Sequence, residues 1–142
     1  MPRFNHLTIF VTVLVQQIIG FLWYSPAMFF SPWLAGIGKR AEEINQSDPV
    51  PFIVAILTSV IFCYTLAWCL QRVGVSTAMD GALVGALVGL GLIGPALAGH
   101  YAFIGFRWGL MAIDIGMELV TCAISGALLA GRPVGGERSV PV

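Results

Sequence analysis

The sequence predicts an all-α membrane protein, in which four transmembrane helices form an antiparallel bundle and an interfacial amphipathic helix lies between the first two. Three observations favour this fold class. Hydrophobic residues make up 58% of the 142 residues and charged residues only 10%, whereas about 25% of the residues in soluble domains are charged. Four apolar stretches are each long enough to cross about 30 Å of hydrocarbon. Most charged residues lie outside these stretches.

The same composition excludes several classes of protein. Seven Lys and Arg residues balance seven Asp and Glu residues, so the chain has no basic field for binding nucleic acid. Cys63, Cys69 and Cys122 lie in apolar stretches without Cys-x-x-Cys spacing, and the chain has only two histidines. We therefore expect no metal site and no cofactor. The sequence also lacks recognisable catalytic motifs, so it gives no positive support for an enzyme.

Each apolar stretch is interpreted as one membrane span. Arg3 precedes the first stretch as in a signal peptide, but Trp23 and Tyr24 follow it where a cleavage site needs small residues, so we expect an uncleaved anchor. The spans belong to a single domain over residues 1–131, and a flexible polar tail follows over residues 132–142. The four predicted spans are Leu7–Tyr24, Val50–Leu70, Ser76–Ala98 and Trp108–Ala130.

The connection between the first two spans contains a segment that is too short to cross the membrane. Ala27–Ile37 is rich in large apolar side chains, which predicts a helix lying in the headgroup layer. Lys39–Glu43 is a polar stretch with room for one or two helical turns. Asp48 and Pro49 then start the second span, because proline is tolerated in a first helical turn.

Basic and aromatic residues predict how the spans are oriented. Four arginines lie on the side of the two termini and three basic residues on the other side, and cytoplasmic loops carry the excess. This difference predicts a multi-pass protein of the cell membrane with both termini in the cytoplasm. The four are Arg3, Arg72, Arg132 and Arg138, and the three are Lys39, Arg40 and Arg107. Interfacial aromatic residues on the second side are Trp23, Tyr24, Trp33, Tyr101 and Trp108.

Polar residues form a stripe along the fourth span. Asp114, Glu118, Thr121 and Ser125 follow one another at spacings of four, three and four, so they fall within about 60° of each other on a helix. Glu118 lies close to the midplane, where we expect a carboxyl group to be protonated unless it finds a partner. Arg107 lies two turns before Asp114 on the same face, and we expect it to neutralise part of that charge.

Two further polar groups are candidates to join this stripe. Gln16 reaches mid-membrane depth on the first span, and we expect it to hydrogen-bond a carboxyl group of the fourth span. Asp80 lies near the start of the third span, where the helix dipole favours a negative charge.

The third span is rich in glycine. Gly81, Gly85 and Gly89 are four residues apart, a small-xxx-small ridge that permits close contact between helix backbones. Asp80 lies on another face with further glycines, so this span is expected to contact neighbours on two sides, as a central helix does. Pro95 removes a backbone hydrogen bond and predicts a kink near the far end of the span.

The polar groups leave three functional interpretations open. In the first, the protein is a non-enzymatic structural or accessory membrane protein, plausibly a homo-oligomer, and its polar groups hydrogen-bond between helices. In the second, they line a route for protons or a small cation, centred on Glu118 and Asp114. In the third, the protein binds lipid or another apolar ligand beside Trp23 and Trp33. The partner that all three share is the lipid bilayer.

Three stretches resemble those of a known family. They are Gly-Phe-Leu-Trp-Tyr-Ser-Pro at residues 20–26 with Phe29 and Trp33 after it, Ala-Met-Asp-Gly-Ala-Leu-Val-Gly at residues 78–85, and Ile-Asp-Ile-Gly at residues 113–116. The chain resembles the family called Domain of Unknown Function 1761 over nearly its whole length. The resemblance implies a small bacterial membrane protein with four spans, and it assigns no activity. In physical terms, Trp23 and Tyr24 anchor the end of the first span, and Pro26 stops the helix by restricting Ser25.

Overall fold

A computed structural model describes residues 4–45, 47–105 and 107–131, and this part of the chain is helical and contains no β-strand. The predicted polar tail over residues 132–142 lies outside the described residues, as do Arg3, Arg132 and Arg138. In chain order the elements are α1 (His6–Trp23), α2 (Phe30–Ile37), the short 3₁₀ helix η1 (Ala41–Glu43), α3 (Val50–Val73), α4 (Ala78–Val88), the π-turn η2 (Gly89–Ile93), α5 (Gly94–Ile104) and α6 (Trp108–Ala130).

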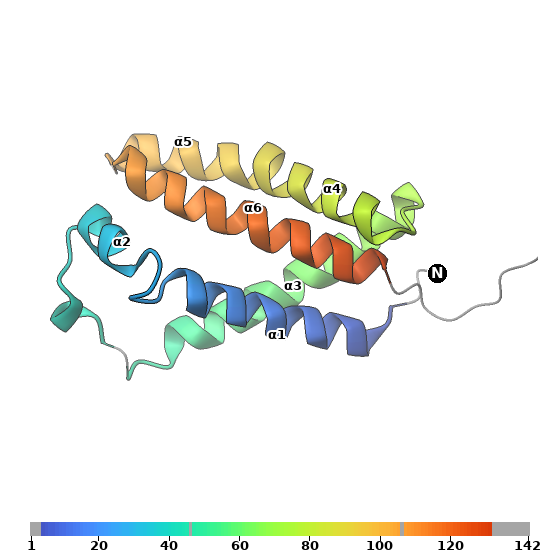
Figure 1. The fold of residues 1–142 in the computed structure, drawn as a ribbon, viewed down its shortest axis with the longest axis horizontal. Coiled ribbons are helices and arrows are strands. Elements are labelled where there is room, and N and C mark those ends of the chain that lie inside the picture. The colour runs from blue at the N-terminus through green and yellow to red at the C-terminus, as the bar shows by residue number, and fades with distance from the viewer. Residues whose placement is uncertain (1–3, 46, 106, 132–142) are drawn as a thin grey trace, which may run out of the picture.

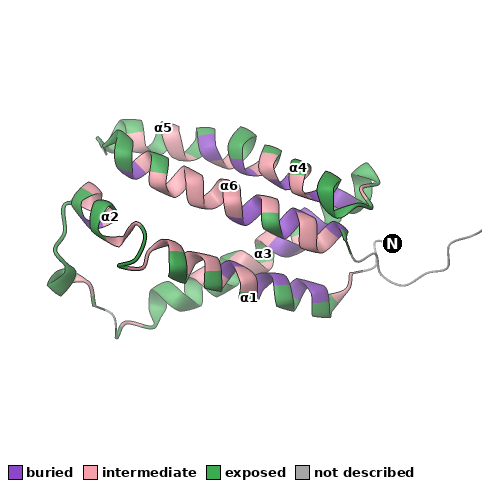
Figure 2. Ribbon diagram, in the orientation of Figure 1, coloured by how far each residue is buried: buried purple, intermediate pink, exposed green. Residues whose placement is uncertain are grey.

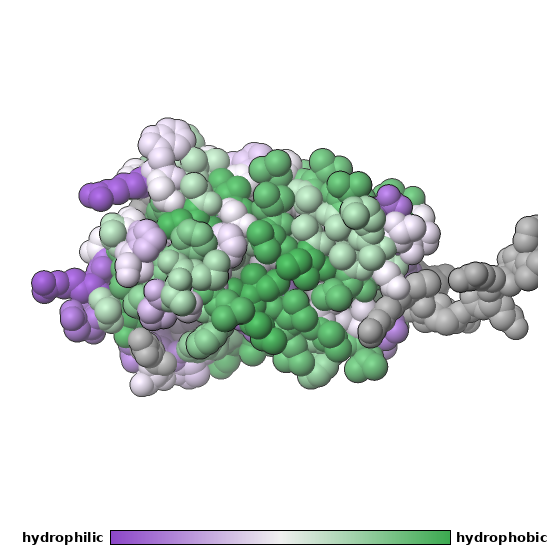
Figure 3. All heavy atoms as spheres, in the orientation of Figure 1, coloured by the Kyte–Doolittle hydropathy of each residue, from purple (hydrophilic) through white to green (hydrophobic). Residues whose placement is uncertain are grey.

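Four helical segments are long and apolar enough to cross a membrane. Large apolar side chains on their outer faces are exposed, among them Phe21 at 77% and Phe103 at 96%. Hydrophobic residues cover the middle of the visible face, and hydrophilic residues gather at its two ends (Figure 3). Water would disfavour such a surface, whereas hydrocarbon does not. The four segments are His6–Trp23, Val50–Val73, Ala78–Ile104 and Trp108–Ala130.

Helix α6 lies at the centre of the fold and contacts each of the five other α-helices. Helices α4 and α5 follow one another along one side of α6, and α1 and α3 lie on its other side (Figure 1). The sequence favoured the third span as the central helix, and this expectation is wrong. The glycine face of that span is turned toward α6, whereas Gly91 and Gly99 on its other faces have no neighbour within 4 Å.

The glycine ridge brings α4 and α6 into close backbone contact. A Cβ atom on Gly81 would collide with the carbonyl oxygen of Gly126, and one on Gly85 with that of Cys122. Gly89 lies against the backbone of Leu119, where an added Cβ would be 3.0 Å from Cα. The residue numbers of the glycines increase along this contact while those of their partners on α6 decrease, so the two helices run in opposite directions.

The π-turn explains why the third span continues past Pro95. The N–H of Gly94 donates to the carbonyl of Gly89, five residues earlier, so the chain holds one extra residue in this turn. That extra residue keeps Gly94 on the ridge face, against Ile115 of α6. The helix therefore runs on to Ile104 instead of ending at Ala98.

Buried residues gather in one half of the molecule (Figure 2). Most of them lie in α1 from Thr8 to Gln16, in the second half of α3 and in the second half of α6, together with glycines of α4. Cys63 packs with Ile9 and Val13, and Leu66 and Leu70 pack with Ala130. The other half of the molecule, where α1 ends and α6 begins, contains fewer buried residues, among them Leu34 and Leu110.

Candidate functional site

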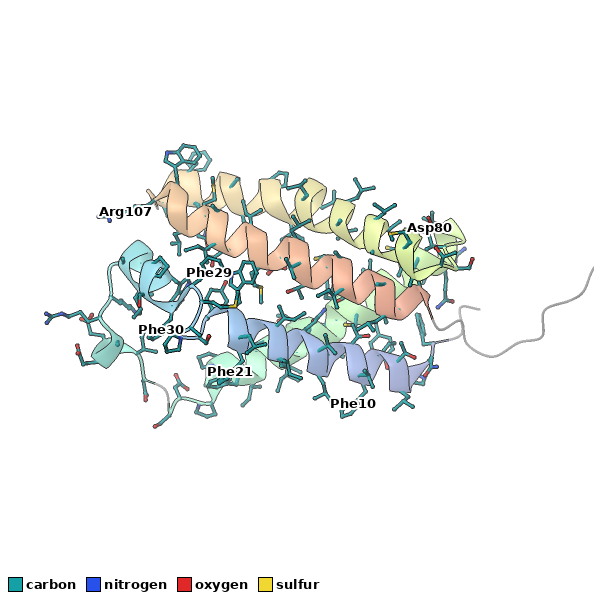
Figure 4. All side chains as sticks on the ribbon, in the orientation of Figure 1. Phe10, Phe21, Phe29, Phe30, Asp80 and Arg107 are labelled. Carbon is teal, nitrogen blue, oxygen red and sulfur yellow. The ribbon has the colours of Figure 1, made fainter. Side chains whose placement is uncertain are left out.

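Two tyrosines hold the carboxyl group of Asp114. The hydroxyl of Tyr24, which follows α1, donates to Asp114 Oδ1 at 2.7 Å, and the hydroxyl of Tyr101 on α5 donates to Oδ2. The expected neutralisation of Asp114 by Arg107 is wrong, because the two form no ion pair within the described chain. Arg107 is exposed and points outward from the end of the molecule (Figure 4). Asp114 thus links the end of α1, α5 and α6.

The turn after α1 places Tyr24 at this position. The indole N–H of Trp23 donates to the carbonyl of Ile113 at 3.1 Å. Its ring lies over Gly116, where a Cβ atom would be 3.3 Å from Cζ2, and against Phe29 with 4.8 Å between ring centroids. The stretch at residues 20–26 therefore packs on the stretch at residues 113–116.

Helix α2 packs beside the turn after α1, and together they form a corner against the start of α6. The ring of Trp33 lies 5.4 Å from that of Tyr24 between centroids, and Leu34 is buried. Gly36 lies against Leu110 of α6, where a Cβ atom would be only 2.8 Å from that of the leucine. The hydroxyl of Ser25 donates to the carbonyl of Leu22 at 2.7 Å, and Pro26 lies exposed in the turn that follows.

A second set of polar contacts joins α1 to its neighbours deeper in the bundle. Gln16 donates to the hydroxyl of Ser125 at 2.8 Å, and both side chains are buried. The expectation that Gln16 bonds a carboxyl group is therefore wrong, because Gln16 lies at the depth of Ser125. Gln17 points to α3 and donates to Ser59 at 2.9 Å. Thr121 is buried, and its hydroxyl contacts the sulfur of Met117 at 3.8 Å.

Glu118 differs from the other residues of the stripe. Its side chain is half-buried, and within the described residues its carboxyl group has no hydrogen-bond partner. It lies ten residues into α6, about 15 Å along the helix axis and near the middle of the span. A Cβ atom on Gly89 would be 3.1 Å from the carbonyl oxygen of Glu118, so the π-turn lies at the same depth.

Asp80 is not part of this site. Figure 4 shows it at the opposite end of the molecule from Arg107. The hydroxyl of Thr77 donates to the Asp80 carboxylate at 2.6 Å, and the Asp80 N–H donates to the Thr77 hydroxyl oxygen at 3.1 Å. Thr77 is the N-cap of α4, and its hydroxyl oxygen satisfies one backbone N–H at the start of the helix.

Asp114 and Glu118 are the two acidic residues of α6, and the hydroxyls of Tyr24 and Tyr101 bind the first of them. The described residues contain no group of three or more His, Cys, Asp or Glu side chains placed to hold a metal ion. Burial and the hydrogen bond to Asp114 raise the pKa of Tyr24, so its phenol remains a neutral donor. Both oxygens of Asp114 accept a hydrogen bond, whereas the Glu118 carboxyl group accepts none from the described residues.

The sequence indicated Asp114 and Glu118 as candidates but missed the role of Tyr24 and Tyr101. Both were assigned only to an interfacial aromatic belt. The position of the two tyrosines along the membrane normal could have indicated this role. Both were placed at the interface, and Asp114 lies only two helical turns inside that interface. A phenol hydroxyl is one of the few neutral donors able to reach a carboxylate from that level.

The fold and the site define an all-helical protein with four helices able to span a membrane and a carboxyl pair inside them. A family model described as "Protein of unknown function (DUF1761)" matches residues 7–130, and the chain belongs to this family. No curated protein and no solved structure matches the chain.

Proposed function

We propose that the four spans form an antiparallel bundle around α6 in a cell membrane, with α2 in the headgroup layer and both termini in the cytoplasm. The opposite directions of α4 and α6 along the glycine ridge support the bundle. The aromatic and apolar character of α2, with Lys39 and Arg40 directly after it, supports its place at the interface. The excess of arginine on the side of the termini supports the orientation.

We further propose that the protein is non-enzymatic and carries protons through Glu118. The observation that supports this role is the half-buried carboxyl group near mid-membrane depth, without a hydrogen-bond partner in the described chain. An ionisable group at this depth costs roughly 2.5–3.5 kcal/mol on insertion scales, and such groups usually serve transport or binding. A group used only to join helices would be expected to have a partner.

The contacts of the remaining polar groups support a proton as the cargo in preference to a metal cation. Hard cations need several oxygen ligands. Within the stripe, Asp114 already accepts from two tyrosines and Ser125 from Gln16, and the described residues contain no group of three or more His, Cys, Asp or Glu side chains placed to hold a metal ion. A proton needs only one oxygen, and Glu118 supplies it.

The experiment that tests this function measures proton entry into liposomes that contain the purified protein. A potassium gradient with valinomycin sets the driving force, and a pH-sensitive dye inside reports the flux. We expect the wild type to carry protons faster than empty liposomes and Glu118→Gln to fall to the empty-liposome rate. Asp80→Asn is the matched control: it removes an acid from another span, away from Glu118, and should retain the wild-type rate.

Two results would contradict the proposal. One is a wild-type protein, correctly inserted, that leaves the liposomes as tight as empty ones. The other is a Glu118→Gln variant that carries protons as fast as the wild type. A structural or accessory role would then account better for the molecule, and the buried pair of Gln16 and Ser125 supports such a role. A second copy of the chain would have to bind on another face, because α6 covers the glycine ridge.

A further inference from the structure

We propose that α5 is a hinged gate beside Glu118, which bends at the π-turn and is latched to α6 by the hydrogen bond from Tyr101 to Asp114. The hinge and the latch follow from the packing of α5. Only the purpose of the gate, which is access of water to Glu118, rests on the proposed function.

The hinge is the segment between α4 and α5. Gly89–Ile93 forms a π-turn, a geometry that is rare and frequent at functional sites. Pro95 follows directly and has no N–H to donate back across the turn. Gly91 has no neighbour within 4 Å of its added Cβ position. Gly89 and Gly94 rest on α6 at the two ends of the turn, but between them the angle between α4 and α5 is not fixed by side-chain packing at Gly91 or by a full set of α-helical hydrogen bonds.

The two sides of this hinge are held very differently. Helix α4 is locked to α6, because Gly81 and Gly85 allow direct contact between the two backbones. Helix α5 has one buried residue, Gly94, and the rest of it is half-buried or exposed. Its main contacts are with the π-turn and with α6. A rotation at the hinge would therefore move α5 while α4 stays in place.

The latch is at the far end of α5. Tyr101 lies two turns beyond Gly94, and its hydroxyl donates to Oδ2 of Asp114. Tyr24 donates to the other oxygen of the same carboxyl group and belongs to the corner formed by α1 and α2. Asp114 precedes Glu118 by one helical turn, so release of Tyr101 would open α5 next to Glu118 and leave the corner closed.

The test compares Tyr101→Phe with Tyr24→Phe. Each variant removes one of the two hydroxyls that donate to the Asp114 carboxyl group. Only Tyr101→Phe removes the bond that holds α5 to α6. Hydrogen exchange of the full chain in lipid nanodiscs, read by mass spectrometry, reports the opening of α5. We expect Tyr101→Phe to speed exchange over Gly94–Ile104 by about tenfold, because the hydrogen bond to the Asp114 carboxyl group is lost. Tyr24→Phe should leave that segment within about twofold of the wild type and loosen the turn after α1 instead.

A second variant tests the hinge. Deleting Gly91 removes the extra residue of the π-turn. The ridge glycines are then four residues apart throughout, so Gly94 stays on the face toward α6. We expect this deletion to suppress the exchange increase that Tyr101→Phe causes. The gate is refuted if both tyrosine variants give the same exchange over α5, or if the deletion leaves the increase intact. Loss of flux in Glu118→Gln tests the proton route separately, so the two proposals can fail independently.

Discussion

Replacement of Gly85 by alanine tests the close contact between α4 and α6. The added Cβ atom would fall on the carbonyl oxygen of Cys122 and lie 3.1 Å from the Cα atom of Ala123. Both are backbone atoms of a helix, so no side-chain rotation relieves the collision. The two helices must separate, and Gly81 lies on the same line of contact against Gly126.

The expected change in stability follows from two opposing effects. Forcing an extra methyl group into a packed contact costs about 1–3 kcal/mol. Alanine in place of glycine within a helix contributes about 0.5–1 kcal/mol in the opposite direction. Gly85→Ala should therefore lower the free energy of unfolding by up to about 2.5 kcal/mol. Gly99→Ala is the matched control, since Gly99 is exposed in α5 with no neighbour within 4 Å, and it should raise the free energy of unfolding by about 0.5–1 kcal/mol.

Reversible unfolding in mixed micelles with increasing dodecyl sulfate, followed by circular dichroism, measures both variants against the wild type. The double variant Gly81→Ala with Gly85→Ala should cost less than the sum of the single variants, because the first substitution already separates the helices. The reasoning is refuted if Gly85→Ala is as stable as Gly99→Ala. The close contact of the two backbones would then not exist in the membrane protein.

Three further predictions concern the polar contacts. A double-mutant cycle with Gln16→Ala and Ser125→Ala should give a coupling energy of about 0.6–1.7 kcal/mol, and a value near zero would mean that the two side chains do not bond. Thr77→Ala should reduce the free energy of unfolding by about 0.5–2 kcal/mol through loss of the α4 cap, which the same assay would show. The raised pKa of Tyr24 means that its stabilising contribution is complete below the ordinary tyrosine pKa of about 10 and is lost as the pH rises above it. Stability should therefore decline at alkaline pH more steeply in the wild type than in Tyr24→Phe, and parallel pH profiles would contradict this assignment.

The sequence predicted the helical class and the positions of the spans because these depend on local chemistry. Length and hydropathy place a span, and the start and end of the fourth span agree with the prediction at Trp108 and Ala130. The third span ends later than predicted, at Ile104, because a π-turn accommodates Pro95 inside the helix. A turn of this kind depends on packing against α6, which hydropathy does not report.

The hydrogen-bond partners on neighbouring helices were harder to predict than the face of the helix on which each polar residue lies. The 100° spacing placed Asp114, Glu118, Thr121 and Ser125 on one stripe, but it gives no relative depth or tilt of the neighbouring helices. Gln16 therefore pairs with Ser125 instead of a carboxyl group. Asp114 likewise bonds Tyr24, which lies 90 residues away along the chain, and Tyr101, 13 residues away, whereas the exposed Arg107 points outward.

If Glu118 carries protons as proposed, its carboxyl group must bind a proton that exchanges with water. Infrared spectroscopy of the protein in lipid, transferred from H₂O to D₂O, observes the carboxyl group itself. The account predicts a carbonyl band of a protonated acid that shifts on transfer to D₂O in the wild type and is missing in Glu118→Gln. Identical spectra of the two proteins, or a Glu118 band that does not respond to D₂O, would contradict it.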